Sequence, residues 1–192
     1  MSRLPTSCGA DVAAVRAEPR DDAEQVTQVL GGEPVGVEER RDGWARIVTA
    51  YDYRGWVREE VLGGEGDPAW MAAEGDDPVE RARTYLGTVY EWGGMTERGI
   101  DCSALVHMAY RRLGRLVPRD AHQQEAAATE IDKADTQPGD LLCFGDPSEA
   151  HHIAFWLGDG RILHATAREG VSAVVEEPIA NVEARPVRFV RL

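Results

Sequence analysis

The sequence lacks the long apolar segments that mark a membrane span or an export signal. No run approaches the roughly 18 consecutive apolar residues that a membrane-spanning helix needs. Residues 1–22 contain no apolar block of about 7–15 residues, so no secretory signal is visible. We therefore expect no membrane insertion and a cytoplasmic protein. The alternative is a secreted or wall-associated protein whose signal has been removed.

Basic residues are also scarce. Lys and Arg together number 21 against 34 Asp and Glu, which gives a formal net charge of −13. Nucleic acids and anionic membranes are bound through cations that displace counterions, so both are poor candidates as partners. A substrate with exposed amines suits an acidic chain better, although acidity also serves plain solubility. The sequence gives no indication of the oligomeric state.

Cysteine occurs at only three positions, Cys8, Cys102 and Cys143. The odd number, the wide spacing and the lack of a C-x-x-C pair argue against a disulfide framework. A reducing compartment is the simplest interpretation. We expect one reactive cysteine and two structural ones, with Cys143 in a strand of the core.

The N-terminal third is rich in short apolar runs separated by turn signals. Val35 and Val37 alternate with other residues, and Asp42-Gly43 precedes an aromatic strand, which favours a hairpin. Five short strands within about 50 residues are typical of a small β-barrel. The segment that follows is rich in Gly, Asp and Pro and is typical of a linker.

Beyond the linker, helical and strand patterns succeed each other. Asp77 and Pro78 are typical of an N-cap and a first helical residue. A second helix is predicted from Cys102 to Gly114, and a weaker one over 121–128. The apolar face of the first helix is expected to contain Val79, Ala82, Tyr85 and Leu86. Strands are predicted at 140–144, 152–157, 161–164, 171–177 and 186–192. Helices followed by strands favour an α+β domain with an antiparallel sheet.

Cys102 is the candidate nucleophile because it falls in the first turn of a predicted helix. A helix start offers free N–H groups and a partial positive charge, and both stabilise a thiolate. The alternative is a cysteine buried as a small hydrophobic residue.

Two histidines are predicted to meet across a hairpin. His152 and His164 lie on strands joined by Gly158-Asp159-Gly160, on arms of nearly equal length. A small register offset makes them cross-strand or diagonal neighbours, so that one acts as a base and the other orients it. The alternatives are surface or core histidines, or a metal site with His151, which lacks the usual ligand spacing.

Several short motifs, taken in order, resemble one known family. Asp-Cys-Ser-Ala-Leu-Val at 101–106 resembles the nucleophile motif of NlpC-type cysteine peptidases, which are papain-like bacterial cell-wall endopeptidases. The family motif most often has Gly where this chain has Ala104. The segments VRAEP, GEPVGV, GWARIV and RGWV resemble a bacterial SH3-like domain often fused to these peptidases. Further matching segments lie at 90–94, 118–120, 138–142, 152–158 and 162–165.

The resemblance implies an α+β architecture, in which a small SH3-like β-barrel precedes a papain-like domain of helices packed on an antiparallel sheet. The expected boundaries are 1–65 for the barrel, 66–77 for the linker and 78–192 for the peptidase domain. By resemblance, Cys102 is the nucleophile, His152 the general base and His164 the orienting residue. Tyr90 matches a tyrosine beside the nucleophile, where its phenol donates to the oxyanion unless it is purely structural. No metal and no organic cofactor is implied.

The family resemblance also suggests a substrate. It implies hydrolysis of the γ-D-glutamyl bond to a diamino acid such as meso-diaminopimelate in murein stem peptides, in short peptides with a free N-terminal L-Ala. Asp101 and Asp120 are candidates for binding the amine, and Ser103 and Arg119 for the D-Glu carboxylate. Alternatively, Asp101 caps the helix, and Arg119 and Asp120 form a structural pair.

Other functions remain open at this stage. One is an acyltransferase or amidase on the same Cys–His scaffold, and another is a non-catalytic wall-binding module. We also hypothesise that the SH3-like domain closes one end of the cleft and that Tyr51, Tyr53 or an acidic neighbour contacts the substrate amine. The alternative for this domain is a solvated module with core tryptophans at Trp44 and Trp56.

Overall fold

The computed structural model describes residues 6–64, 66–146, 148–182 and 187–192. The chain divides into two compact units, Met1–Ala72 and Ala73–Leu192. This division falls inside the segment 66–77 that the composition suggests as a linker.

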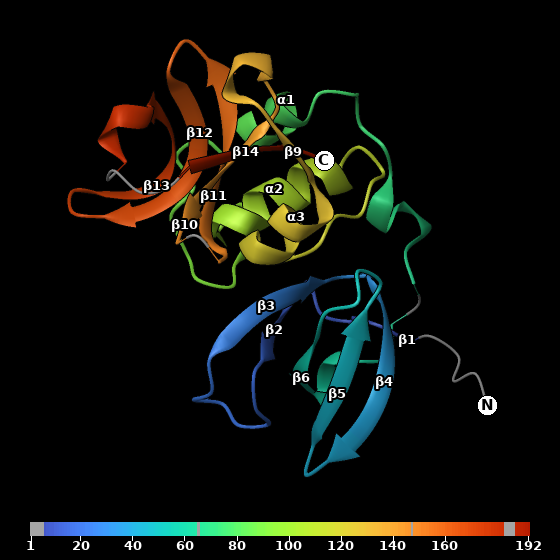
Figure 1. Ribbon diagram of the computed structural model, residues 1–192. Coiled ribbons are helices and arrows are strands. Elements are labelled where there is room, and N and C mark those ends of the chain that lie inside the picture. Colours follow the sequence, from blue (N-terminus) through green and yellow to red (C-terminus); the bar gives the residue numbers. More distant parts are fainter. Residues whose placement is uncertain (1–5, 65, 147, 183–186) are drawn as a thin grey trace. The chain divides into compact units, whose positions relative to one another are not determined.

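The first unit is built on a six-stranded antiparallel sheet (Figure 1). Each of the five runs seen in the sequence forms a strand, and a short strand at Thr6–Ser7 precedes them. The order in the sheet is β1-β4-β5-β6-β2-β3. The strands are β1 (Thr6–Ser7), β2 (Val12–Arg16), β3 (Gln25–Leu30), β4 (Pro34–Arg41), β5 (Trp44–Thr49) and β6 (Arg54–Arg58). Two 3₁₀ helices follow, at Glu59–Val61 and Pro68–Met71.

Local sequence explains the hairpin between β4 and β5. Asp42 and Gly43 have φ values of 52° and 78°, the left-handed conformations that a two-residue primed turn requires. Trp44 and Trp56 are buried, and the guanidinium groups of Arg58 and Arg41 lie 4.4 and 5.1 Å from their respective ring centroids. The apolar core of this unit contains Cys8, Ala13, Val15, Val29, Val35, Ala45, Ile47 and Val57.

The second unit begins with a short helix, α1 (Pro78–Arg83). Its predicted cap is present, because the Asp77 carboxylate accepts hydrogen bonds from the backbone N–H groups of Val79 and Glu80. The helix ends before Leu86, which is 48% exposed, so the prediction that Leu86 belongs to the apolar face was wrong. The other helices are α2 (Cys102–Arg111) and α3 (Ala121–Ala127).

A second six-stranded antiparallel sheet carries the histidines. Its order is β13-β12-β11-β10-β14-β9, and a separate two-stranded sheet pairs β7 (Met95–Thr96) with β8 (Gly99–Ile100). The six strands are β9 (Thr129–Ile131), β10 (Leu141–Gly145), β11 (Ala150–Gly158), β12 (Arg161–Arg168), β13 (Val171–Pro178) and β14 (Val187–Arg191). Two 3₁₀ helices, Lys133–Asp135 and Ile179–Asn181, complete the unit. The α+β class is therefore confirmed.

Both faces of this sheet are covered. On one face, Phe155 of β11 stacks on Tyr110 of α2 with ring centroids 6.4 Å apart, and Figure 1 shows α2 and α3 against β11. The opposite face buries an apolar cluster with the 3₁₀ helix at 179–181 packed on it. The strand residues of that cluster are Leu142, Phe144, Ala154, Ile162 and Phe189.

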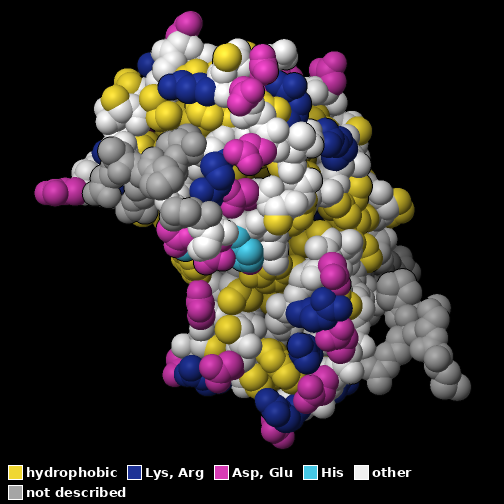
Figure 2. Space-filling view, in the orientation of Figure 1, with side chains coloured by type: hydrophobic (Ala, Val, Ile, Leu, Met, Phe, Trp, Pro, Cys, Tyr) yellow, Lys and Arg dark blue, Asp and Glu magenta, His cyan; other side chains and the backbone are white. Residues whose placement is uncertain are grey.

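Charges of both signs are interspersed on the face shown in Figure 2, and cations are not gathered there in a single stripe. Exposed ion pairs of the two units include Arg54 with Asp52 at 2.9 Å and Arg83 with Glu176 at 2.7 Å. In the part of the chain that the structure describes, no helix has the length and apolar composition of a membrane span.

Candidate active site

Cys102 is the first residue of α2, at the position that the sequence predicts. The preceding residue, Asp101, is the N-cap, and its carboxylate accepts the backbone N–H of Ala104 at 2.8 Å. Cys102 is only 7% exposed. The cap therefore fixes the backbone that carries the thiol.

Arg119 binds the carboxylate of the N-cap residue, Asp101. Its Nη1 and Nη2 atoms donate to the two carboxylate oxygens of Asp101 at 2.9 and 2.6 Å. The backbone N–H of Gly93 donates to the same carboxylate at 2.9 Å, and the Ser103 hydroxyl donates at 3.2 Å. Asp101, Ser103 and Arg119 are all buried, so they form a network that braces the start of α2.

Arg119 forms its buried ion pair with Asp101, a pairing that the sequence analysis did not suggest. Asp120 is the N-cap of α3, where its side chain accepts from the backbone of Gln123 and its own N–H donates to the side-chain oxygen of Gln123 at 3.2 Å. The Asp120 side chain is half-buried, whereas Asp101 is 6% exposed. Binding of substrate by Asp101, Ser103, Arg119 or Asp120 stays a prediction.

The environment of the thiol differs from the sequence expectation. Burial and the negative charge of Asp101 raise the pKa of Cys102 to about 12, although N–H groups of Ile153 and Ser103 and the charge of Arg119 oppose this rise. The helix start alone therefore does not produce a thiolate. A thiol in this setting reacts at neutral pH only if a neighbouring base takes its proton.

The candidate base, His152, lies on β11. The Cys102 sulfur lies within hydrogen-bonding reach of the Ile153 backbone, immediately after His152. His152 is half-buried, and its Nε2 atom lies 2.7 Å from Nδ1 of His164 on β12. Phe155 of β11 pairs with Leu163 of β12. His152 precedes Phe155 on β11 and His164 follows Leu163 on β12, so the two histidines are diagonal neighbours across the strands. The neighbouring His151 is exposed and contacts Asp146 at 3.0 Å.

The chain of imidazoles ends on Glu177, a residue that the sequence analysis missed. Nε2 of His164 lies 2.8 Å from Oε1 of this carboxylate, and both side chains are buried. The other oxygen, Oε2, accepts hydrogen bonds from Arg168 and from Nδ2 of Asn181. The register of β12 and β13 places His164 opposite Val175. Glu177 follows Val175 by two residues on β13, so its side chain lies on the same face of the sheet and reaches His164. No local motif marks Glu177.

The charge of Glu177 determines where the protons lie in the series His152–His164–Glu177. Burial alone would raise the pKa of Glu177, but hydrogen bonds from Arg168, Asn181 and His164 lower it to about 2, so the group is an ionised acceptor. Burial also lowers the pKa of His164, which favours the neutral ring. Neutral His164 then carries its proton on Nε2 and accepts at Nδ1, so His152 donates from Nε2. In the neutral form of His152, Nδ1 is then the unprotonated atom and is able to act as a base.

Tyr90 is tethered next to the start of α2. It forms a backbone bridge to Ile100, two residues before Cys102, and its N–H donates to the Ser172 carbonyl at 3.2 Å. Burial raises the pKa of Tyr90, and the nearby Cys102 and Asp101 contribute to the rise. The phenol therefore stays protonated and can donate a hydrogen bond.

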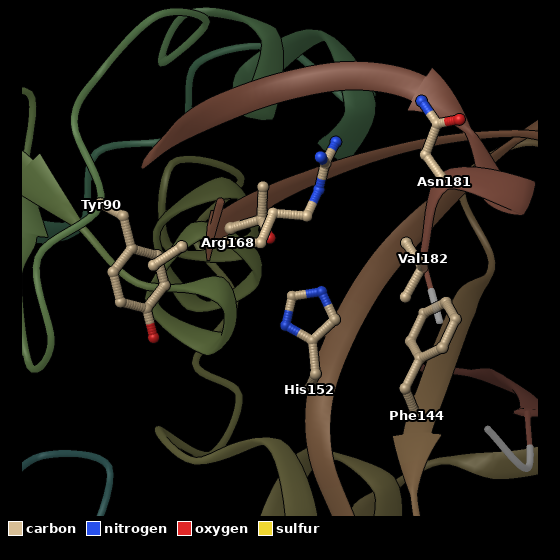
Figure 3. A pocket seen from close by; sticks show the side chains of 8 residues that line it. Tyr90, Phe144, His152, Arg168, Asn181 and Val182 are labelled. Atoms are coloured by element: carbon tan, nitrogen blue, oxygen red, sulfur yellow. The ribbon is translucent and has the colours of Figure 1, made fainter. Parts of the chain in front are cut away.

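A cavity of about 360 Å³ opens beside His152. Figure 3 shows Tyr90 on one side of it and Phe144, Val182 and Asn181 on the other, with His152 and Arg168 between them. Cys102 is not among the residues that line it. Over the described ranges, no group of three or more His, Cys, Asp or Glu side chains is placed to hold a metal ion.

Comparison with known proteins agrees with this geometry. Residues 87–186 match the model of the NlpC/P60 family, and residues 15–62 match that of the bacterial dipeptidyl-peptidase SH3 domain. A solved structure, NlpC1 from Trichomonas vaginalis, superposes with a TM-score of 0.54 and 26% identity, over 98% of this chain and 68% of that one. The predicted SH3-like and papain-like folds are confirmed.

Curated relatives are similar over about half of this chain. The probable endopeptidase NlpC of Escherichia coli K12 is 36% identical over 95 residues, which cover 48% of this chain and 62% of the relative. The γ-D-glutamyl-L-lysine dipeptidyl-peptidase of Bacillus subtilis 168 is 32% identical over 93 residues, which cover 47% and 31%. The chain spans about half the length of the first curated relatives that it matches.

Proposed function

The chain belongs to the NlpC/P60 family, and from this premise we propose that it is a cysteine peptidase. Its substrate is a murein stem peptide, cleaved between γ-D-glutamate and the diamino acid that follows. The observation that carries the proposal is the chain of contacts from His152 through His164 to Glu177, next to a cysteine at a helix start. A buried thiol with a raised pKa needs a base to remove its proton before it can act as a nucleophile at neutral pH.

The first half of the reaction forms a thioester. The Cys102 sulfur attacks the γ-carbonyl of D-Glu while its proton passes to Nδ1 of His152. The oxyanion accepts hydrogen bonds from the Cys102 backbone N–H and from the Tyr90 phenol. The C–N bond then breaks, and the His152 imidazolium gives its proton to the leaving amine.

The second half restores the enzyme. The neutral Nδ1 of His152 takes a proton from water, and the resulting hydroxide attacks the thioester carbonyl. When the tetrahedral intermediate collapses, the thiolate leaves and receives its proton back from His152. His164 and Glu177 keep the Nε2 proton of His152 in place throughout, so the transferred proton is gained and lost at Nδ1.

The N-terminal amine of the substrate needs an anionic partner. Asp101 already accepts hydrogen bonds from Arg119, Gly93 and Ala104, and it is buried. Asp120 caps α3 through its side chain, and it is half-buried and therefore more accessible to a ligand than Asp101. We therefore favour Asp120 over Asp101 for binding the free L-Ala amine.

Mass spectrometry of incubated peptides tests the function. The peptides are L-Ala-γ-D-Glu-meso-diaminopimelate and its N-acetylated form, and Cys102→Ala is the control variant. Release of L-Ala-D-Glu from the free-amine peptide alone supports both the peptidase and amine recognition. Cleavage of both peptides retains the peptidase and discards the amine requirement.

Failure to cleave is equally informative. If neither peptide is cleaved while Cys102 is still alkylated selectively, the site acts on another amide or transfers its acyl group. If neither is cleaved and Cys102 is unreactive, the chain is a non-catalytic wall-binding module.

A further inference from the structure

The cavity beside His152 has a defined place in the proposed reaction. The acyl group becomes attached to Cys102, whereas the leaving amine takes its proton from His152. A cavity whose wall contains His152 but not Cys102 therefore lies on the leaving-group side. Its volume of about 360 Å³ falls within the usual range for small-ligand pockets.

The wall of this cavity carries a cation. Arg168, at the end of β12, has a side chain that is 35% exposed, and Figure 3 shows it above the His152 ring. Its Nη2 atom forms an ion pair with Glu177. A guanidinium has five N–H donors in a planar fork, so donors remain for a ligand.

Glu177 orients Arg168 without facing the cavity itself. The carboxylate is buried, is absent from the cavity lining, and shares its charge with His164 and Asn181. Among the residues that the structure describes, the rest of the wall contains no Asp, Glu, Lys or Arg, and it includes Phe144, Thr166 and Val182. A cation on a wall of otherwise mixed polar and apolar side chains favours a ligand with an anionic end.

We infer that this cavity binds the amino acid that leaves with the amine, and that Arg168 binds a carboxylate of that amino acid. The inference rests on the proposed function, because it assigns the leaving group of that reaction. Two carboxylates fit this chemistry. One is the α-carboxylate of a C-terminal residue, and the other is the side-chain carboxylate of meso-diaminopimelate, which lysine lacks.

Four peptides separate these sources. Each begins with L-Ala-γ-D-Glu and ends in meso-diaminopimelate or L-lysine, with a free α-carboxylate or an α-carboxamide. Dissociation constants are measured by calorimetry on Cys102→Ala, and kcat/KM on the active protein. An acid-over-amide preference points to the α-carboxylate, whereas a diaminopimelate-over-lysine preference in both forms points to the side-chain carboxylate. We expect at least one preference of roughly 10–100-fold, the range for a hydrogen bond to a charged group.

Arg168→Gln should abolish that preference, in binding as in turnover. This variant also frees Glu177, but the resulting loss of activity is common to all four peptides and cancels in their ratios. Arg161→Gln, on the same strand with an exposed side chain, is the matched control and should keep the preference.

Three results overturn the inference. They are equal binding of all four peptides, no binding of any, or a preference that survives in Arg168→Gln. If the active protein cleaves no peptide, the proposed function fails, yet the calorimetric preference in Cys102→Ala still decides whether the cavity binds a carboxylate.

Discussion

Nε2 of His152 lies 2.7 Å from Nδ1 of His164, and the rings meet edge to face at an interplanar angle of 69°. A hydrogen bond between two neutral imidazoles has one donor and one acceptor, so the protonation of one ring dictates that of the other. The contact of His164 with Glu177 sets the direction of this chain. Activity should therefore depend on a carboxylate that touches neither the nucleophile nor the base.

Glu177→Gln is expected to reverse the tautomers of both histidines. Arg168 and Asn181 both donate toward Oε2, so the amide oxygen of Gln turns to them and its NH₂ group turns to His164. His164 then accepts at Nε2 and donates from Nδ1, which leaves the proton of His152 on the atom that should act as the base. We expect kcat/KM to fall by about 10–100-fold, as for other residues that orient a functional side chain.

Imidazole ¹⁵N chemical shifts provide a readout that a merely structural role would not change. The shifts of His152 and His164 should exchange their donor and acceptor patterns in Glu177→Gln. Glu176→Gln, the adjacent residue that pairs with Arg83, is the control and should leave the shifts and the activity unchanged. Unaltered shifts in Glu177→Gln would refute the tautomer assignment.

Removing the base should expose the high pKa of Cys102. In His152→Gln the thiol loses its proton acceptor, so its thiolate fraction should rise about tenfold per pH unit below the pKa of about 12. Alkylation of Cys102 by iodoacetamide, followed by peptide mapping between pH 7 and 9, measures this slope. The unmodified protein should react faster at pH 7 and show a shallower slope.

His151→Gln serves as the matched control for that experiment, because His151 is exposed and paired with Asp146. Labelling of the fully buried Cys143 reports any unfolding. Equal slopes in the parent and His152→Gln would mean that His152 does not accept the proton of Cys102.

Arg119→Met should destabilise the second unit. Loss of one partner from a buried ion pair typically costs about 3–5 kcal/mol, and Asp101 would keep only its uncharged donors. Urea unfolding at pH 7 measures the change, and Arg98→Met on the exposed surface is the control. A stable variant with a raised KM would instead identify Arg119 as a ligand of the substrate carboxylate.

His107 should make stability depend on pH in the acid range. Burial, assisted by the charges of Arg119 and Arg111, lowers the pKa of His107 to about 3 from its usual 6.5. Between these values the unfolded chain binds a proton that the folded protein does not. The contribution of His107 to the free energy of unfolding is therefore fully present above pH 6.5. It falls as the pH decreases, by up to about 1.4 kcal/mol per pH unit.

The His107→Asn variant tests this dependence, because the amide can donate to the Val117 carbonyl, which lies 2.8 Å from Nδ1 of His107. Its urea-unfolding free energy should change less steeply than that of the parent between pH 4.5 and 6.5. His122→Gln, on the exposed side of α3, should keep the parent slope. A variant slope equal to the parent slope would contradict the prediction.

Local signals predicted those parts of the site that depend on neighbours in sequence. Asp101 before a helical pattern indicated where Cys102 lies, and a glycine-rich turn between two strands indicated that His152 and His164 meet. The pairing of Asp101 with Arg119 and the contact of Glu177 with His164 depend on packing and on strand register. The raised pKa of Cys102 likewise depends on burial, which the helix position alone does not reveal.

The order of strands in the second sheet bears on how the protein is synthesised. The strand at 187–191 lies between β10 and β9, so a nascent chain that ends before Val187 leaves both strands without this partner. The sheet that carries both histidines then has an open edge, which is a hazard for aggregation. All six strands of the first unit lie within residues 6–58, so its sheet can form before the second unit has been synthesised. During translation, the first unit should fold before the sheet of the second unit closes.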